Sequence, residues 1–174
     1  MIQRIQTLYL LAAALGCIAC LCLPVGQLVN ASGDTVATLY NLWVHVPYAP
    51  GMDTLVQDGT AEPVLAEVAE GQHLFTPWAL FALLVLTATG LLFDIFLYRT
   101  RLVQSRLAML CCILLLGWYG VYTAFVFLLG ERFAADFSPT PWAALPAIAC
   151  ICSYFAFRAI LKDEALVRSL DRLR

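Results

Sequence analysis

Charged residues are scarce in this chain of 174 residues: Asp, Glu, Lys and Arg make up 13% of it, against about 25% in ordinary soluble domains. Hydrophobic residues make up 62%. A soluble fold of this size cannot hide that much apolar surface in its own core. The composition therefore excludes an ordinary soluble domain and indicates a protein that lipid covers in part.

The motifs of common enzyme and metal sites are also absent from the sequence. It contains no Gly-rich phosphate loop, no HExxH and no nucleophile elbow. Only two histidines occur, His45 and His73, and neither has a recognised metal-ligand spacing with its acidic neighbours. Those neighbours are Asp53, Glu62, Glu67 and Glu70. We therefore predict a non-enzymatic protein without a metal or cofactor, and we expect no nucleic-acid partner.

Long apolar segments take the place of such motifs. The segment 107–129 contains no Asp, Glu, Lys or Arg, and it follows a short basic turn, Tyr98–Arg106. At 1.5 Å per helical residue, a segment of this length exceeds the roughly 30 Å hydrocarbon core of a bilayer. We expect the first segment to be a retained anchor, not a cleaved signal peptide. The predicted spans in this single domain, residues 1–174, are residues 3–23, 77–97, 107–129 and 141–161.

The distribution of charge predicts how these spans are oriented. Nine of the ten Lys and Arg residues lie near the termini or in the basic turn, and only Arg132 lies on the other side. Positively charged residues near spans are enriched in the cytoplasm. The pattern therefore predicts an all-α membrane protein, a left-handed four-helix bundle with both termini cytoplasmic.

The outer segment, residues 24–76, should carry a small β structure. Val25–Val29 and Thr35–Val46 are rich in β-branched and aromatic residues, and the turn residues Asn30–Asp34 separate them. An isolated hairpin is marginally stable, so we expect it to rest on the outer helix ends or to gain a third strand. Val64–Ala69 could be strand or helix, and Gly130–Ser138 should be a short outer loop.

Asp94 is the one carboxylate within a predicted span. An unpaired acid in a membrane is unfavourable and is a candidate for function. Arg158 lies at a similar predicted depth on the fourth span, so we predict a structural ion pair between Asp94 and Arg158. The alternative is a small transporter or lipid-binding protein that uses Asp94, although few other polar residues lie near the middle of the spans.

Cysteines offer a second alternative, a membrane thiol-redox enzyme. Cys17 and Cys20 have the C-x-x-C spacing of redox motifs. All seven cysteines fall inside predicted helices, where a thiol ionises poorly, and none lies in an outer loop. We therefore predict that they pack the helices. They are Cys17, Cys20, Cys22, Cys111, Cys112, Cys150 and Cys152.

The tail, residues 162–174, changes from apolar to amphipathic, and we expect the fourth span to continue into it as a cytoplasmic helix. Leu166, Leu170 and Leu173 recur at spacings of four and three, so they share one face. This helix could lie against lipid headgroups or dock a partner. The predicted docking residues are Leu166, Arg168, Leu170, Arg172, Leu173 and Arg174.

Two stretches, Met1–Leu11 (MIQRIQTLYLL) and Ala159–Arg174 (AILKDEALVRSLDRLR), resemble the Bacteroidota integral-membrane family catalogued as domain of unknown function 4293. The similarity in length, number of spans and long first outer loop covers essentially the whole chain. It implies a retained first helix and a location in the inner membrane, and it implies no activity and no catalytic residues.

Together these features favour an accessory or scaffolding subunit that binds a membrane or cytoplasmic partner. Small residues would also let helices approach closely within one chain or in a homo-oligomer. They are Ala12, Ala13, Ala14, Gly16, Gly117 and Gly120.

Overall fold

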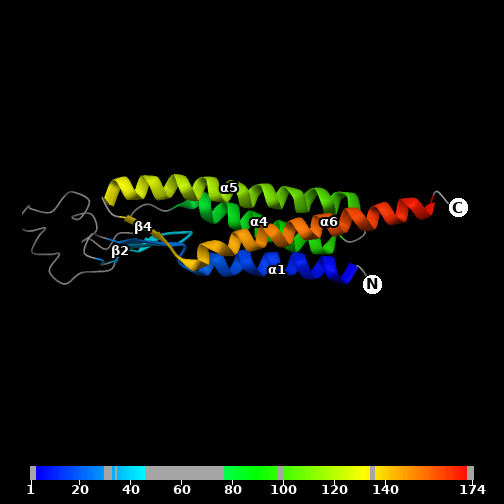
Figure 1. Cartoon of the computed structure of the whole chain (residues 1–174), viewed down its shortest axis with the longest axis horizontal. Coiled ribbons are helices and arrows are strands. Elements are labelled where there is room, and N and C mark those ends of the chain that lie inside the picture. The colour runs from blue at the N-terminus through cyan, green and yellow to red at the C-terminus, as the bar shows by residue number, and fades with distance from the viewer. Residues whose placement is uncertain are drawn as a thin grey trace, which may run out of the picture.

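The protein is an elongated bundle of four long helices with a small sheet at one end, as seen in a computed structural model (Figure 1). The structure describes residues 3–29, 33, 35–45, 77–97, 100–133 and 136–171. The long helices are α1 (Gln3–Cys22), α4 (Trp78–Phe96), α5 (Arg101–Phe133) and α6 (Leu145–Asp171). Predictions for residues 46–76, including Val64–Ala69 and His73, lie outside the described residues.

The four helices run alternately up and down. Helices α1 and α5 each pack against both α4 and α6, so α1 lies diagonally opposite α5 and α4 lies diagonally opposite α6. Each helix is long and apolar enough to cross a membrane. At most a third of the residues in any of these spans are buried inside the bundle, so most of each apolar helix surface faces outward. The predicted number of long apolar helices is confirmed.

The third helix is longer than its predicted span. Helix α5 begins at Arg101, within the predicted basic turn, and ends at Phe133. Its first turn is fixed by Gln104, whose backbone N–H donates to Thr100 O at 3.0 Å. The Gln104 side-chain Nε2 also donates to Asp94 O at 3.2 Å, at the end of α4. Part of the segment predicted as a basic turn, Tyr98–Arg106, is therefore helical from Arg101 onward, and the helix is longer than the span predicted within it.

The last helix confirms the predicted continuation of the fourth span into the tail. A 3₁₀ turn, η1 (Pro141–Ala144), leads directly into α6, which runs without interruption from Leu145 to Asp171. In Figure 1 its C-terminal end projects beyond the other helices. Residues 172–174 lie outside the described part of the chain.

The sheet has four antiparallel strands in the order β3-β2-β1-β4. The predicted hairpin is confirmed as β1 (Gly26–Val29) paired with β2 (Thr35–Leu39), with Gly33 at φ +88° in the connection. The predicted strand 35–46 is instead divided between β2 and β3 (Val44–His45). A turn interrupts it, because Tyr40 N–H donates to Trp43 O at 2.9 Å.

The fourth strand comes from the connection between α5 and α6. Residues Asp136–Pro139 form β4, which pairs with β1 in the register Leu28↔Phe137 and Gly26↔Pro139. The Phe137 ring lies so close to Gly26 that a Cβ on Gly26 would collide with it. The segment predicted as a plain outer loop therefore contains a strand that ties the last two helices to the first hairpin.

Candidate functional site

The end of the bundle next to the sheet holds a buried polar network centred on Asn41, which lies in the turn between β2 and β3. Its Nδ2 donates to Cys20 O at the end of α1, at 2.6 Å. Its Oδ1 accepts a hydrogen bond from Trp118 Nε1 of α5, at 3.3 Å. Both Asn41 and Trp118 are fully buried. One side chain therefore connects the sheet, the first helix and the third helix.

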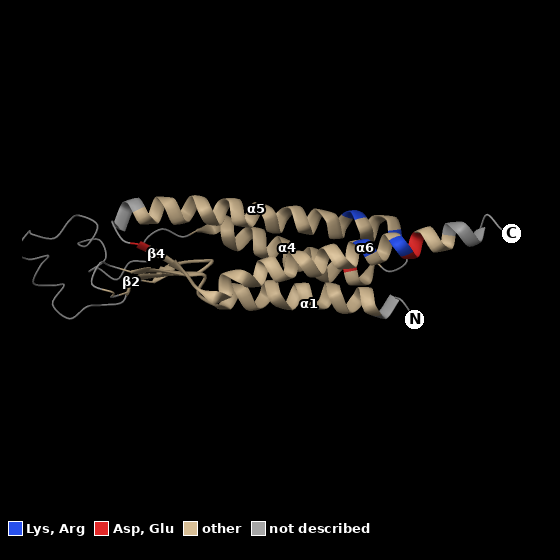
Figure 2. Ribbon diagram, viewed as in Figure 1, with Lys and Arg blue, Asp and Glu red and all other residues tan. Residues whose placement is uncertain are grey.

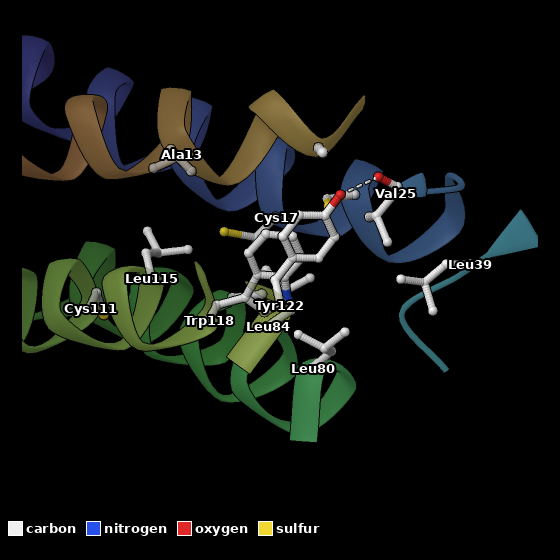
Figure 3. Close-up of a cluster of buried hydrophobic side chains, with 14 of the residues drawn as sticks. Ala13, Cys17, Val25, Leu39, Leu80, Leu84, Cys111, Leu115, Trp118 and Tyr122 are labelled. Carbon is white, nitrogen blue, oxygen red and sulfur yellow. Dashed lines mark hydrogen bonds between the residues drawn. The ribbon is translucent and has the colours of Figure 1, made fainter. Parts of the chain in front are cut away.

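Aromatic side chains of α5 pack beside this network, and Figure 3 shows two of them, Trp118 and Tyr122, next to Val25. The rings of Trp118 and Tyr122 stack with centroids 5.0 Å apart, and Tyr122 OH donates to Val25 O at 2.8 Å. The neighbouring Tyr119 OH donates to Ala143 O at 2.7 Å. Each of these hydroxyls therefore has a backbone partner, and the network holds the sheet against the helices.

The opposite end of the bundle has a different kind of buried polar group. Each helix buries one stripe of residues at spacings of three and four. On α1 the stripe begins at Gln6, on α4 it ends at Asp94, on α5 it begins at Gln104, and on α6 it passes through Ser153. Thr87 and Ser105 are also buried, but each hydroxyl donates to a backbone oxygen of its own helix. Apart from these two, each helix contributes one buried polar side chain to this part of the bundle: Gln6, Asp94, Gln104 and Ser153. We call these four residues the axial polar cluster.

Asp94 is the ionisable member of the axial polar cluster. It is 0% exposed, and neither carboxyl oxygen has a hydrogen-bond partner in the described part of the chain. Gln6 Nε2 and Ser153 Oγ are buried and equally without a partner there. Three of the four members therefore carry unsatisfied polar atoms, which is unusual because buried polar groups are nearly always hydrogen-bonded.

The predicted ion pair between Asp94 and Arg158 is not present in the structure. The buried stripe of α6 contains Ser153, Ala156 and Ile160, and Arg158 is exposed. At 100° per residue, Arg158 points away from Ala156 and Ile160, toward the outside of the bundle. Asp94 faces the axis, so similar depth alone does not bring the two charges together.

Two interhelical contacts place Asp94 and Ser153 at nearly the same depth. Gly90 of α4 lies against Cys111 of α5, since a Cβ added to Gly90 would be 3.2 Å from Cys111 Sγ. Cys112 Sγ donates to Cys150 O at 3.7 Å, which joins α5 to α6 at the same level. Asp94 follows Gly90 by four residues and Ser153 follows Cys150 by three, so both lie roughly 5 Å nearer the basic end.

A salt bridge closes the basic end of the bundle. Arg101 Nη1, at the start of α5, lies 2.8 Å from Asp163 Oδ2 of α6. The Arg101 side chain is 31% exposed and that of Asp163 is 16% exposed. Thr100, Arg101, Leu102, Val103 and Glu164 line a shallow open groove beside this pair. The ion pair therefore fixes α6 to α5 just before α6 leaves the bundle.

The cysteines are all free thiols and lie on the helices. Cys17, Cys20, Cys111 and Cys112 are buried in the bundle, and Cys22 is exposed at the end of α1. Cys112 and Cys150 face each other across α5 and α6. Among the described residues, no group of three or more His, Cys, Asp or Glu side chains is arranged to hold a metal ion; His45 is exposed on β3.

Three of the predicted docking residues, Leu166, Arg168 and Leu170, lie in the projecting end of α6 (Figure 1). Leu166 is 47% exposed, and its neighbour Val167 is 40% exposed. The helix includes Arg168 and Leu170, whose side chains lie outside the described part of the structure, as do Arg172, Leu173 and Arg174.

Sequence reasoning overlooked Gln6 and Gln104 as members of a site. A signal was available, since each lies four residues before a small or apolar residue of its buried stripe, Leu10 or Ala108. A polar residue that extends such a stripe indicates a buried polar position. The two glutamines were missed because each lies two residues from an arginine, near the start of its helix, where a polar residue usually faces solvent.

The fold and the axial polar cluster define a class: a bundle of four apolar helices with polar side chains at its axis and a small antiparallel sheet at one end. The chain belongs to the family described as Domain of unknown function (DUF4293), whose model matches residues 2–173. The resemblance seen in the sequence is thereby confirmed over essentially the whole chain. A comparison with curated proteins found no match.

Proposed function

We propose that this protein is a multi-pass protein of the inner membrane, with both termini cytoplasmic, and that it is a non-enzymatic accessory or scaffolding subunit. In this proposal the projecting end of α6 docks a membrane or cytoplasmic partner. A four-helix bundle with a largely apolar outer surface supports the membrane location, because lipid would cover that surface.

Charge supports the orientation. The described basic side chains lie at the end of the bundle away from the sheet, whereas Asp136 lies on β4 (Figure 2). These basic residues are Arg101, Arg106, Arg158 and Lys162. Because basic residues near spans mark the cytoplasmic side, the sheet would lie on the outer side of the membrane and the end of α6 in the cytoplasm.

The extension of α6 beyond the bundle carries the docking role. Asp163 contacts Arg101, the first residue of α5, so the residues after Asp163 lie past the start of that helix. Residues 164–171 add about 12 Å of helix. Leu166 is 47% exposed, because at this point the helix has left the bundle. An apolar face on a projecting helix fits a groove in a partner.

The segment that would dock carries leucines on one face and arginines around the rest of the helix. The sequence places Leu166, Leu170 and Leu173 on one face, and Arg168, Arg172 and Arg174 beside or opposite it. The matching partner surface is an apolar groove with acidic residues at its rim. Arginine side chains would select that rim, and the leucines would supply most of the buried apolar area.

Affinity purification from native membranes in mild detergent tests this proposal. The tagged wild-type protein is compared with a variant that carries Leu166→Ser, Leu170→Ser and Leu173→Ser, and bound proteins are identified by mass spectrometry. The matched control is Asp171→Ser, which changes the opposite face of the same helix. We expect a stoichiometric partner with the wild type and the control, and its loss from the triple variant.

Two results would contradict the docking role. One is a partner retained equally by the triple variant, which would place the interface elsewhere on the chain. The other is the absence of any stoichiometric partner from the wild-type sample. The membrane location and orientation need a separate test. Single cysteines introduced in the sheet and in the tail are labelled in intact cells with a membrane-impermeant thiol reagent, and only those in the sheet should react.

A further inference from the structure

The axial polar cluster contains more unsatisfied polar atoms than a packing role explains. The two Asp94 oxygens are acceptors without donors, whereas Gln6 Nε2 and Ser153 Oγ are donors without acceptors, all of them buried. Leaving each such group unpaired is unfavourable, because it loses its hydrogen bonds to water and gains none in the protein. Unpaired buried acceptors and donors of this kind favour the binding of a small polar species.

No fixed positive charge neutralises Asp94 in the described structure. Helix α1 presents Gln6, which is neutral, and Tyr9, whose ring centroid lies 6.0 Å from that of Phe155. Helix α5 presents Cys111, close enough to Asp94 for an electrostatic interaction. On α6, Arg158 faces outward and Asp163 is paired with Arg101. A buried carboxylate without a counter-charge is strongly unfavourable, and binding a proton removes the charge.

We propose that Asp94, Gln6 and Ser153 form a proton-binding site in the axis of the bundle. One carboxyl oxygen of Asp94 carries the proton, and water bridges the carboxyl group to Gln6 Nε2 and Ser153 Oγ. Buried waters typically make about three hydrogen bonds to groups of this kind. The fourth cluster member, Gln104, holds the backbone of the site, because its Nε2 donates to Asp94 O.

Asp94 lies closer to the basic end of the bundle than to the sheet. Asp94 lies two residues before the end of α4, near the basic end. Toward the sheet, the axis is lined by apolar residues such as Leu84, Leu91 and Leu115, and Thr87 Oγ1 donates to Leu83 O in its own helix. The basic end is therefore the shorter route for a proton to Asp94. The inference goes beyond the docking role and holds whether or not α6 binds a partner.

Dicyclohexylcarbodiimide tests the protonation state directly, because it reacts with protonated carboxyl groups in apolar surroundings. The full-length protein in detergent is treated at neutral pH and the label is located by peptide mass spectrometry. We expect label on Asp94, none at this position in Asp94→Asn, and none on Asp163 or Asp136, which serve as internal controls. Folding of the variant is checked by its elution in size-exclusion chromatography.

Infrared difference spectroscopy tests the bridging water. Wild type minus Asp94→Asn should show the C=O band of a protonated carboxyl group, and the band should shift in Ser153→Ala and in Gln6→Leu as hydrogen bonds to the carboxyl are lost. Ser105→Ala is the matched control, because Ser105 is buried but its Oγ donates to Leu102 O within α5. This control should leave the band unchanged.

Three results would overturn the site. The absence of both label and band at neutral pH would mean that Asp94 is ionised. Protection of Asp94 from the reagent by sodium ions would mean that a metal cation occupies the site in place of a proton. A band unaffected by Ser153→Ala and Gln6→Leu would mean that these side chains do not share the site.

Discussion

The two ends of the helix bundle bury polar side chains in opposite ways. At the sheet end, Asn41, Trp118 and Tyr122 are buried and each makes a hydrogen bond to another element. At the basic end, Asp94, Gln6 and Ser153 are equally buried and carry polar atoms without partners in the described structure. Both ends lie within one bundle, so the difference does not come from the type of fold.

The difference separates a structural role from a functional one. Hydrogen bonds at the sheet end connect segments far apart in sequence, such as Asn41 and Trp118, and so hold the sheet in place. The unpaired polar atoms of Asp94, Gln6 and Ser153 at the basic end are unfavourable for stability as they stand. Selection for stability alone favours apolar residues there. Substitutions at the sheet end should therefore lower the free energy of unfolding in detergent more than substitutions at the basic end.

Trp118→Ala should have the largest effect. The indole is fully buried, stacks on Tyr122 and donates to Asn41, so its removal leaves a cavity and an unpaired amide. We expect the free energy of unfolding to fall by about 3–5 kcal/mol, measured by denaturant titration in detergent. The matched control is Trp142→Ala at the same end, where the indole is 46% exposed. Equal losses in the two variants would contradict a structural core at this end.

Asn41→Ala should destabilise the protein by about 1–3 kcal/mol, because it leaves Trp118 Nε1 and Cys20 O buried without partners. A double variant with Trp118→Phe should lose less than the sum of the two single losses, since both remove the same hydrogen bond. Additive losses would show that the bond between these two side chains contributes little.

Arg101→Gln should have a small effect. The guanidinium lies 2.8 Å from Asp163 but is 31% exposed, so water screens the pair. We expect a loss below about 1 kcal/mol that shrinks further as salt concentration rises. Thr100→Ala, at the neighbouring exposed position, is the control. A loss that does not depend on salt would mean that Arg101 acts through packing and not through its charge.

Much of this architecture could be predicted from sequence, because bilayer thickness and helical rise fix the length of an apolar span. The hairpin β1–β2 was also predictable from its turn residues around Gly33. Strand β4 was not, since Asp136–Pro139 is short and polar and becomes a strand only by pairing with β1. Asp94 was identified as a candidate, but its partner was wrong: depth can be read from sequence, whereas the face of Arg158 depends on how α6 packs.

Asp94→Asn should have the smallest effect on stability, below about 0.5 kcal/mol at neutral pH. A protonated carboxyl group and an amide are both neutral and similar in shape. The Asp94 carboxyl oxygens have no hydrogen-bond partner in the described structure that the change could remove. Were Asp94 an ionised member of a buried ion pair, the same substitution would lower the free energy of unfolding by about 3–5 kcal/mol. Arg158→Gln is the matched control and should likewise change little, because Arg158 is exposed. A large fall in the free energy of unfolding of Asp94→Asn would show that the basic end has a structural role like that of the sheet end. A negligible fall, together with the loss of carbodiimide labelling, leaves proton binding as the reason for an acid at this position.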